Sequence, residues 1–328
     1  MSDKKSVLKS LKDEDIPYVD LRFCDPKGKL QHVTIDSDIV DEDFLDEGFM
    51  FDGSSIAGWK SIEKSDMKLM PDPKSAYIDP FFAEKTLCLH CSVLEPDTNE
   101  PYGRDPRGTA LKAEAYLKQT GIGDTFYCGP EAEFFLFDDV RYSNRPNKVS
   151  FEVDAMDGAW NTDTVYEMGN MGHRPGTKGG YFPLPPIDAA QDIRGEMLST
   201  MKRMGMKVDK HHHEVASPQH ELGLIFGSLT EQADNILKYK YVIQQVAAAY
   251  GKTATFMPKP YYGDNGSGMH VNMSIFKGGK PVFAGDKYAD LSSEALWFIG
   301  GILKHAKTIN AFTNPTTNSY KRLIPGFE

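Results

Sequence analysis

The sequence contains few of the features that mark membrane, secreted or nucleic-acid-binding proteins. No apolar run approaches the roughly 20 residues of a membrane span, and residues 1–10 are polar and lysine-rich, unlike a signal peptide. The four cysteines in 328 residues are too few for a disulfide scaffold. The formal net charge of −10 argues against a nucleic-acid partner. We therefore expect a soluble, cytoplasmic protein that needs cations to bind anionic substrates.

One short motif has zinc-binding residue types but lacks the spacing of a complete zinc site. Cys88 and Cys91 form a C-x-x-C pair with no second pair, whereas a structural zinc site needs four ligands. Apolar residues alternate along residues 87–93, which is typical of a strand with a buried face. This pattern favours two buried thiols over half a zinc site.

Three consecutive histidines at positions 211–213 precede Glu214, and Glu221 follows in the same region. Adjacent residues of a strand face opposite ways, so the three histidines cannot all bind one ion. The H-E-x-x-H spacing of a helical zinc site is also absent. The sequence favours metal binding by the carboxylates of Glu214 and Glu221 over a zinc site.

Hydrophobic periodicity predicts an α+β protein in two parts. A polar, turn-rich stretch at residues 95–104 marks the boundary between a mostly β domain, residues 1–104, and a mixed α/β catalytic domain, residues 105–328. Asp105 and Gly121 are the residue types that begin and end a helix. The predicted elements are a hairpin over 18–35, strands over 86–93, 129–137, 207–215, 254–257 and 269–276, and helices over 106–120, 188–205, 228–250 and 292–312.

The strand predicted over 129–137 carries two acidic residues among aromatic and aliphatic ones. Glu131 and Glu133 are two positions apart, so their side chains point to the same face of the strand. Two ionised carboxylates repel each other, and burying them is costly unless a positive charge lies between them. A hard divalent cation such as Mg²⁺ or Mn²⁺ would supply that charge. The alternative is an acidic face that is turned toward water.

Two glycine-rich segments have the composition of anion-binding loops. Residues 263–268 lead into a strand on which His270, Asn272 and Ser274 share a face. No Gly-Lys-Ser/Thr follows, so this is not a Walker A loop. Residues 172–183 are basic and glycine-rich, which indicates contact with phosphate or carboxylate, with a solvated loop as the alternative.

A further polar segment, residues 314–328, is predicted to be a loop that holds two basic side chains. The acids, the histidine, the glycine-rich loops and these bases together have the composition of a two-cation phosphoryl-transfer site. In such sites metal ions, arginine and lysine neutralise a triphosphate while the protein positions the acceptor.

Six motifs that run through the chain in order resemble those of bacterial type I glutamine synthetase. They are FDGSSIAGW (51–59), GPEAEFF (129–135), KGGYFP (178–183), HHEV (212–215), GDNGSGMH (263–270) and NPTTNSYKRLIPGFE (314–328). The resemblance implies an N-terminal β-grasp domain and a catalytic domain built on a curved antiparallel sheet with helices. It also implies a homo-oligomer, a double-ring dodecamer, whose active sites lie between neighbouring subunits.

The same resemblance implies roles for residues of these motifs and of their surroundings. Two cations, Mg²⁺ or Mn²⁺, would be held by Glu133, Glu214 and Glu221 and by Glu131 and His270, respectively. Glutamate would be bound by Asn265, Gly266, Arg322 and Glu328, ATP by Asp209, Phe226, Asn272 and Ser274, and ammonium by Asp52, Ser55, Tyr181 and Glu214, with Asp52 coming from the adjacent subunit.

The implied reaction has two steps. The side-chain carboxylate of glutamate attacks the γ-phosphate of ATP, which gives γ-glutamyl phosphate and ADP. Ammonium then loses a proton to Asp52, and ammonia displaces phosphate. Glu328 is expected to close the site and keep water from the acyl phosphate. With Arg322, these two acids are the predicted catalytic residues.

Two features depart from the family pattern. The insert between Glu214 and Glu221 lacks a glycine that is common there in the family. The family pattern also continues beyond the position of Glu328, with further arginines and a glutamate for the second metal. We therefore expect a truncated chain that alone forms little or no glutamine, and glutamine formation by the purified chain would contradict this expectation.

Two other functions compete with this interpretation. A γ-glutamyl ligase for an amine or polyamine belongs to the same superfamily, but Asp52 within an intact Asp-Gly-Ser-Ser segment favours ammonium. A non-catalytic subunit that acts through assembly would fit a truncated chain, but the metal and glutamate motifs are retained up to Glu328. Comparing ammonia with small amines as acceptors distinguishes the first alternative, and an activity assay combined with size-exclusion chromatography distinguishes the second.

Overall fold

The computed structural model describes residues 3–167, 169 and 172–325, and the chain divides into two compact units. The first unit comprises Met1–Phe126, Arg203–Met206 and Gly227–Lys238, and the second comprises Tyr127–Lys202, Lys207–Phe226 and Tyr239–Glu328. Among the described residues, none of the helices combines the length and the hydropathy that a membrane span requires.

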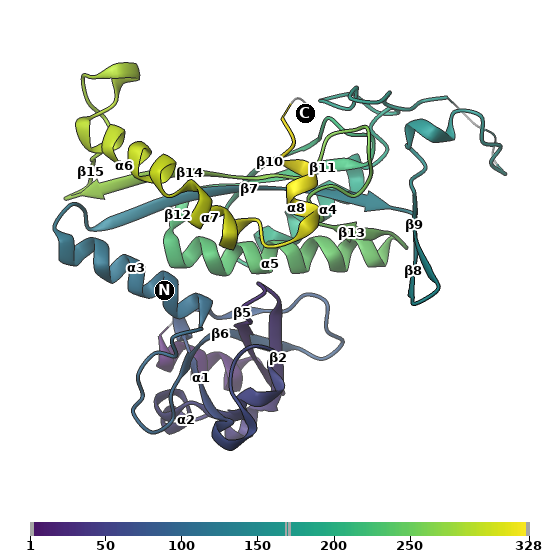
Figure 1. The fold of residues 1–328 in the computed structure, drawn as a ribbon. Coiled ribbons are helices and arrows are strands. Elements are labelled where there is room, and N and C mark those ends of the chain that lie inside the picture. Colours follow the sequence, from purple (N-terminus) through teal and green to yellow (C-terminus); the bar gives the residue numbers. More distant parts are fainter. Residues whose placement is uncertain (1–2, 168, 170–171, 326–328) are drawn as a thin grey trace. The chain divides into compact units, whose positions relative to one another are not determined.

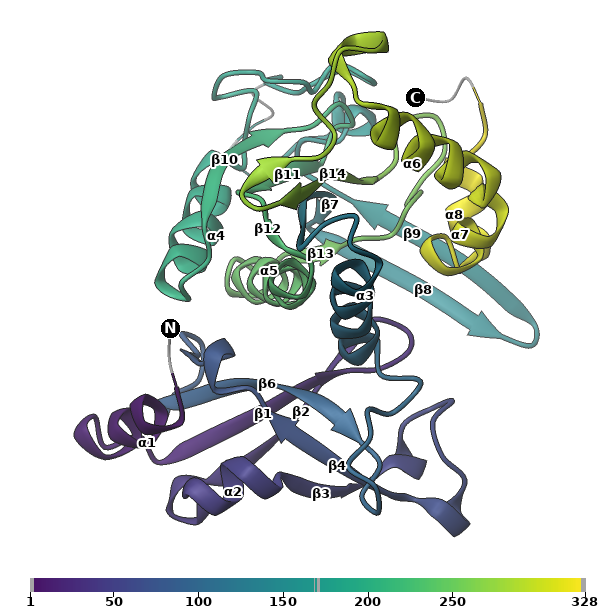
Figure 2. The same ribbon diagram turned by 90° about the vertical axis from the view of Figure 1, so that its left-hand side faces the viewer.

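The first unit is built on a six-stranded sheet with the strand order β2-β1-β6-β4-β3, in which β5 also pairs with β6. Strands β1 and β6 run parallel, and the other pairs run antiparallel (Figure 2). The elements are α1 (Lys4–Asp13), β1 (Tyr18–Cys24), β2 (Leu30–Asp36), α2 (Glu42–Glu47), β3 (Phe49–Asp52), β4 (Asp66–Pro71), β5 (Tyr77–Ile78), β6 (Thr86–Leu94) and α3 (Pro106–Thr120).

The core of this unit follows from the pattern of its strands. Val19, Leu21 and Phe23 are at most 5% exposed, and they pack with alternate residues of β6 and with the inner faces of α1 and α2. The predicted hairpin over 18–35 and the strand over 86–93 are confirmed. Helix α3 begins after Asp105 and ends before Gly121, which has a φ of +69°, as the capping residues predict.

The second unit is built on a sheet with the strand order β10-β11-β7-β14-β15, in which β13 also pairs with β7 (Figure 1). Strands β8 and β9 form a separate hairpin. The elements that follow α3 are β7 (Thr125–Phe137), β8 (Asp139–Arg145), β9 (Lys148–Asp154), α4 (Gln191–Arg203), β10 (Val208–His213), β11 (Gln219–Leu224), β12 (Gly227–Ser228), α5 (Leu229–Ala249), β13 (Thr253–Thr255), β14 (Met269–Lys277), β15 (Lys280–Pro281), α6 (Ser293–Lys304), α7 (Ala306–Thr313) and α8 (Thr317–Arg322).

Helix α5 is attached to the sheet of the second unit by a buried tyrosine. The Tyr239 hydroxyl donates to the Ala132 carbonyl (2.6 Å) and accepts from the Leu222 N–H (3.1 Å), so it joins α5 to both β7 and β11. The next residues on the same face, Val242 and Ile243, are fully buried. This packing supports β7 and β11 from one side and leaves their other side for the charged residues.

Helix α4 confirms the predicted apolar stripe as core. Its members Ile193, Met197 and Met201 are at most 6% exposed. The helix begins at Gln191 rather than at Asp188. The Asp188 side chain accepts from the Ala190 N–H (3.2 Å) before the helix begins, as turn-forming aspartates do.

The structure corrects two predictions near the C-terminal end. The single helix predicted over 292–312 is two helices, α6 and α7, which meet at His305, where φ is −103° and ψ is 10°. Two consecutive glycines in the last turns of α6 lower the helix propensity there. Residues 317–322, predicted to lie in a loop, form α8, which begins with a capping box between Thr316 and Ser319.

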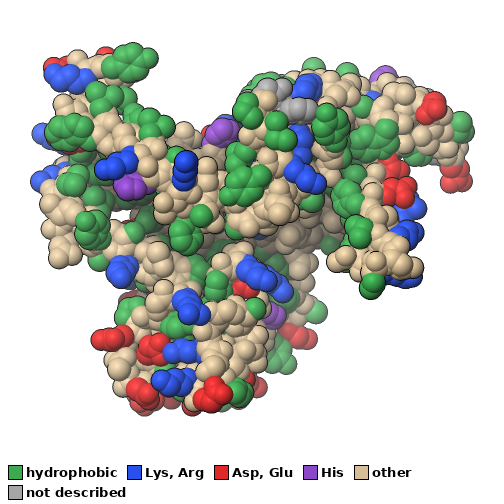
Figure 3. Space-filling model, in the orientation of Figure 1, with side chains coloured by type: hydrophobic (Ala, Val, Ile, Leu, Met, Phe, Trp, Pro, Cys, Tyr) green, Lys and Arg blue, Asp and Glu red, His purple; other side chains and the backbone are tan. Residues whose placement is uncertain are grey.

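The β8–β9 hairpin was not predicted, although its second strand alternates apolar and polar residues. Tyr142 and Val149 on its surface are 78% and 83% exposed. Figure 3 shows further hydrophobic side chains gathered on α6 and α7, where Trp297 and Phe312 are 73% and 80% exposed. Apolar surface of this kind is typical of regions that other polypeptide segments cover.

Candidate active site

A row of charged side chains crosses three neighbouring strands of the second unit. Glu133 on β7 lies directly opposite Glu221 on β11, and Glu221 lies directly opposite His212 on β10. Residues directly opposite each other project from the same face of a sheet. The hydrogen-bonded register therefore brings acids from distant parts of the sequence together, as the sequence predicts.

Glu214 joins this row from the end of β10. Its N–H donates to the Gln219 carbonyl (2.7 Å), which closes the connection between β10 and β11. The Nδ1 atom of His212 lies 3.5 Å from Glu214 Oε1, and its Nε2 atom lies 3.6 Å from Glu221 Oε1. One ligand atom from each of these three residues lies within 4.8 Å of the others, which is the spacing of atoms that share a cation.

The Glu133 carboxylate is held by two N–H donors on the same oxygen. The side-chain Nε2 of Gln219 donates to Glu133 Oε2 (2.7 Å), and the Gly268 N–H donates to the same atom (3.0 Å). The other oxygen, Oε1, takes no part in these two bonds. This arrangement fixes the side chain in the way that hydrogen-bonded metal ligands are fixed.

The electrostatics of the site favour a bound cation. Burial raises the pKa of the Glu133 carboxyl, and the carboxylates of Glu214 and Glu221 raise it further, although the Gly268 N–H opposes them. Burial also raises the pKa of Glu214. A divalent cation would stabilise the ionised form of all three carboxylates, and oxygen-rich sites of this kind fit hard ions.

A small cavity of about 150 Å³ lies against these acids. It is lined by Glu133, Glu214, Lys259, Asn265, Gly266, His270 and Arg322. The Nε atom of Arg322 is buried and, among the described residues, has no hydrogen-bond partner. A buried guanidinium nitrogen without an acceptor fits an anionic ligand such as a carboxylate or a phosphate.

Two positions of the 263–268 loop have no room for a side chain, because neighbouring atoms lie too close to the backbone. A Cβ atom at Gly266 would lie 2.3 Å from the Pro258 carbonyl oxygen, and one at Gly268 would lie 2.5 Å from Arg322 Nη2. Helix α8 holds Arg322 there because Asn318 exchanges two hydrogen bonds with the main chain of Lys259 (2.7 and 2.8 Å). The loop and the helix therefore meet at the cavity.

The remaining predicted metal residues lie on the two central strands. Glu131 is two residues before Glu133 on β7, and the neighbouring strand β14 carries His270. His270 lines the cavity. Glu131 and Glu133 share a face of β7 because they are two positions apart. Four of the five predicted metal residues therefore lie on strands of one sheet, and Glu214 follows the end of β10.

The predicted nucleotide residues lie at another part of the same sheet. Phe226 and Asn272 both lie next to Gly129 of β7. A Cβ atom built on Gly129 would lie 3.6 Å from the Cβ atom of Phe226 and 4.0 Å from the Cβ atom of Asn272. Phe226 is 62% exposed and packs edge-on against Tyr127, with 5.6 Å between the ring centroids. Ser274 follows Asn272 on β14, and exposed Asp209 packs against Gly223 of β11.

The 172–183 loop is mostly exposed but contacts the site at three of its residues. The Gly180 N–H donates to the Val215 carbonyl (2.9 Å), and a Cβ atom at Gly180 would lie 2.5 Å from the Glu214 carbonyl oxygen. The ring of Tyr181 lies edge-on to His212, with 5.9 Å between centroids. Lys178 Nζ donates to Asn265 Oδ1 (2.9 Å).

Three predicted residues lie elsewhere. Asp52 and Ser55 belong to the first unit. The Asp52 side chain accepts from the hydroxyl and the N–H of Ser54 (2.6 and 2.8 Å), and these bonds lower the pKa of Asp52 below its usual value. Glu328 lies outside the described residues.

A second group of metal-binding residue types lies on the other face of β10 and β11. His213, His220 and Asp157 have ligand atoms within 4.8 Å of one another. Arg194 Nη1, however, lies 3.0 Å from His220 Nδ1 and can only donate, so the other nitrogen of that imidazole carries the proton. A protonated nitrogen cannot bind a metal, and this group therefore does not form a metal site. The histidine run divides between the two faces, as predicted.

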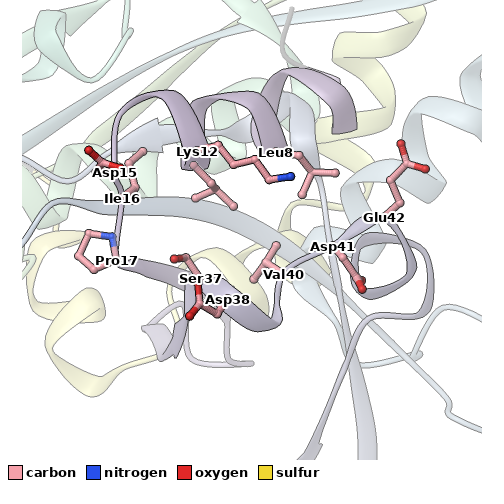
Figure 4. Close-up of a pocket in the computed structure, with 11 residues that line it drawn as sticks. Leu8, Lys12, Asp15, Ile16, Pro17, Ser37, Asp38, Val40, Asp41 and Glu42 are labelled. Atoms are coloured by element: carbon pink, nitrogen blue, oxygen red, sulfur yellow. The ribbon is translucent and has the colours of Figure 1, made fainter.

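The thiols of Cys88 and Cys91 are confirmed as buried. The two residues are three positions apart on β6, so their side chains point to opposite faces of the strand, which argues against a shared zinc ion. A larger hollow of about 850 Å³ lies in the first unit between α1 and α2 (Figure 4). Its lining includes Lys12, Asp15, Asp38, Asp41 and Glu42. Asp41 caps α2 by accepting from the Phe44 N–H (2.7 Å), which is a structural role.

Sequence reasoning missed Gln219 and Lys259. Gln219 is 1% exposed, and Lys259 Nζ donates to the Asp264 carbonyl. The position of Gln219 between Glu214 and Glu221, two predicted metal ligands, was the signal in the sequence that could have identified it. Lys259 precedes the 263–268 loop without a recognisable motif.

Comparisons with known proteins agree with this geometry. Two family models match: glutamine synthetase, beta-Grasp domain, at residues 15–96, and glutamine synthetase, catalytic domain, at residues 103–328. The glutamine synthetases of Rhodobacter capsulatus and Cereibacter sphaeroides are 75% and 74% identical over 328 residues, which is 100% of this chain and 75% and 70% of theirs. The solved structure of Plasmodium falciparum glutamine synthetase is similar with a TM-score of 0.92 and 31% identity, over 100% of this chain and 64% of that chain. The chain therefore belongs to the glutamine synthetase family, whose members use ATP and divalent cations to join ammonia to glutamate.

Proposed function

We propose that the charged site described above is where the protein carries out the ATP-dependent ligation of ammonia to L-glutamate, which yields L-glutamine, ADP and phosphate by way of γ-glutamyl phosphate. The observation that supports this most directly is the convergence of Glu133, Glu214 and Glu221, from three separate segments, beside a cavity that contains Arg322. Such convergence supplies both the cation ligands and an anion-binding group that phosphoryl transfer requires.

The cations are Mg²⁺ or Mn²⁺, because the ligands are carboxylates and one imidazole. Glu133, Glu214 and Glu221 hold one ion, and Glu131 and His270 take part in holding the other. When bound, the ions neutralise the phosphate oxygens of ATP.

The glutamate substrate binds at the 263–268 loop and α8. Asn265 and Gly266 offer polar main-chain and side-chain groups, and Arg322 binds a carboxylate of the substrate or the transferred phosphoryl group. On the nucleotide side, exposed Phe226 offers a ring for the base, and Asp209, Asn272 and Ser274 offer polar groups.

Ammonium binds between acids. Glu214 and Tyr181 contribute from the second unit, Ser55 also belongs to the pocket, and Asp52 comes from the adjacent subunit. Asp52 is ionised near neutral pH, as an aspartate with an ordinary or lowered pKa is, so its carboxylate attracts ammonium and accepts its proton. Glu328 closes over the site and excludes water.

The protein is a cytoplasmic homo-oligomer, and a dodecamer if full length, because the ammonium pocket takes Asp52 from the adjacent subunit. Exposed hydrophobic side chains on α6 and α7 support this assembly, because apolar surface of this kind is typical of contacts with another protein chain. Light scattering after size-exclusion chromatography measures the assembly, and a strictly monomeric complete protein would contradict a shared site.

The test of the proposed function is ligand binding followed by turnover. We expect calorimetry to detect Mn²⁺ binding, and ATP binding only when Mn²⁺ or Mg²⁺ is present. Glu133→Gln and Glu221→Gln should each weaken both, whereas exposed Glu152→Gln should change neither. In a chain that forms glutamine, the first two variants should also lose that activity. Equal Mn²⁺ affinity in all variants would overturn the assignment.

A further inference from the structure

Gln219, at the start of β11, is a buried amide whose hydrogen bonds reach three parts of the site. The residue is 1% exposed. Its Nε2 donates to Glu133 Oε2 (2.7 Å) and to the Gly266 carbonyl (3.1 Å), and its Oε1 accepts from the Ala216 N–H (3.2 Å). A side-chain amide nitrogen carries two protons, so both are used, one toward a proposed metal ligand and one toward the glycine-rich loop.

The main chain of Gln219 is fixed as firmly as its side chain. Its carbonyl accepts from the Glu214 N–H (2.7 Å), and its N–H donates to the Ala216 carbonyl (3.1 Å). The amide therefore projects from a closed turn between two proposed metal ligands, Glu214 and Glu221. Because the side chain is held in this way, a movement of Glu133 or of the Gly266 carbonyl changes the hydrogen bond that the amide makes to the other.

The loop also contacts Glu133 directly. The Gly268 N–H donates to Glu133 Oε2 (3.0 Å), and the Glu133 N–H donates to the Gly268 carbonyl (3.1 Å). One carboxylate oxygen is thus shared between Gln219 and the 263–268 loop. When a cation fixes the other oxygen of Glu133, it fixes the acceptor on which both donors depend.

We propose that Gln219 is a positioning residue that couples cation binding at Glu133 to the ordering of the 263–268 loop. The proposal rests on the function proposed above, in which Glu133 holds a cation and this loop binds glutamate. Coupling of this kind is reciprocal: a cation that orders Glu133 orders the loop, and a substrate that orders the loop favours the cation. The site would then bind glutamate well only after its metal is in place.

The test uses the purified 328-residue chain with Mn²⁺ as the probe. Mn²⁺ affinity is measured from the electron paramagnetic resonance signal of the free ion. Ordering of residues 263–268 is measured by hydrogen–deuterium exchange with and without Mn²⁺. Gln219→Leu removes all three side-chain hydrogen bonds, whereas Gln219→Met keeps the length of the side chain, adds no charge and removes both donors. Gln232→Leu, at another buried glutamine of the first unit, is the matched control.

In the unmodified chain and in Gln232→Leu we expect Mn²⁺ to slow exchange at residues 263–268. Both Gln219 variants should bind Mn²⁺ about 10-fold more weakly, which is the usual effect of removing a partner of a metal ligand. Saturating Mn²⁺ should leave exchange in their loop unchanged. Gln219→Met retains the length of the buried side chain without adding a charge, so it serves as the test if Gln219→Leu does not fold.

A Gln219 variant that binds Mn²⁺ as tightly as the unmodified chain, or whose loop is still protected by Mn²⁺, would overturn the proposal. Glu133→Gln separates this result from a failure of the proposed function. If Glu133→Gln weakens Mn²⁺ binding and the Gln219 variants do not, only the role of Gln219 is wrong. If the unmodified chain binds no Mn²⁺, the cation site itself is wrong and the role of Gln219 is wrong with it.

Discussion

Glu133 and Glu221 are cross-strand neighbours in the antiparallel pairing of β7 with β11. Two acids directly opposite each other destabilise a sheet. Here burial adds to the cost, because it raises the pKa of Glu133 before the neighbouring carboxylates raise it further. The pair is tolerable in a folded protein if a cation lies between the two side chains, and this gives a group of predictions about stability and binding.

Glu133→Gln should weaken Mn²⁺ binding by at least ~10-fold and yet stabilise the metal-free protein. The substitution removes a metal ligand, but it also removes one of three buried or partly buried carboxylates that repel one another. Mn²⁺ titration and thermal unfolding in a chelator measure the two effects. Glu152→Gln on β9 is the control because that side chain is 69% exposed. A metal-free variant less stable than the unmodified chain would contradict the repulsion argument.

Mn²⁺ itself should raise the midpoint of thermal unfolding. Free Mn²⁺ at 100 times its dissociation constant stabilises the folded state by about 2.7 kcal/mol if it does not bind the unfolded chain. For a unit of this size that corresponds to a shift of about 5–10 °C. Differential scanning fluorimetry measures the shift, which an excess of EDTA should abolish. An unchanged midpoint at saturating Mn²⁺ would mean that the acids do not share an ion.

Asp154→Asn should remove part of the pH dependence of stability. Burial alone would raise the pKa of Asp154, but hydrogen bonds from Trp160 Nε1 (2.9 Å), Asn161 Nδ2 (2.6 Å) and the Ala155 N–H (2.8 Å) lower it below its usual value. The folded state therefore binds fewer protons than the unfolded state. The resulting stability is present above the unfolded pKa of about 3.9 and is lost as the pH falls through the folded pKa.

The variant should accordingly be about 1 kcal/mol less stable than the unmodified chain at pH 7, with a smaller difference at pH 2.5. Urea unfolding at a series of pH values measures this. Asp163→Asn, at an exposed acid of the same region, should leave the pH profile unchanged. A difference that stays constant from pH 7 to pH 2.5 would show that the ionised form of Asp154 is not what the three donors stabilise.

Gly266→Ala should disturb the cavity although it adds only a methyl group. The new Cβ atom would lie 2.3 Å from the Pro258 carbonyl oxygen, which is main chain and cannot rotate away. Overpacking of this kind costs about 1–3 kcal/mol, and the displaced loop should also weaken Mn²⁺ binding through Gln219. Gly176→Ala is the matched control, because a Cβ atom there meets no atom within 4 Å. Equal stability of the two variants would show that the loop relaxes freely.

Much of the fold follows from local patterns in the sequence. Alternation along β1 and β6 and the capping residues Asp105 and Gly121 predict their elements because these signals lie within a few residues. The break at His305 and the helix α8 were missed for the opposite reason. The apolar pattern continues through His305, and α8 is short, polar and positioned by Asn318 against Lys259, far away in the sequence.

The candidate site shows the same division. That Glu131 and Glu133 share a face follows from their spacing alone. That Glu221 faces Glu133, or that Gln219 holds both Glu133 and Gly266, depends on which strands pair and in what register. No local pattern contains this information, so the roles of the acids came from resemblance and the role of Gln219 came only from the three-dimensional arrangement.

The register of β11 has a consequence for how this region tolerates changes in length. The segment between Glu214 and Glu221 lacks a glycine that is common in the family, yet Glu221 still pairs with Glu133. Side chains of a strand alternate, so a slip of one residue would turn Glu221 to the far face. A single deletion between Gln219 and Glu221 would therefore remove the carboxylate from the site.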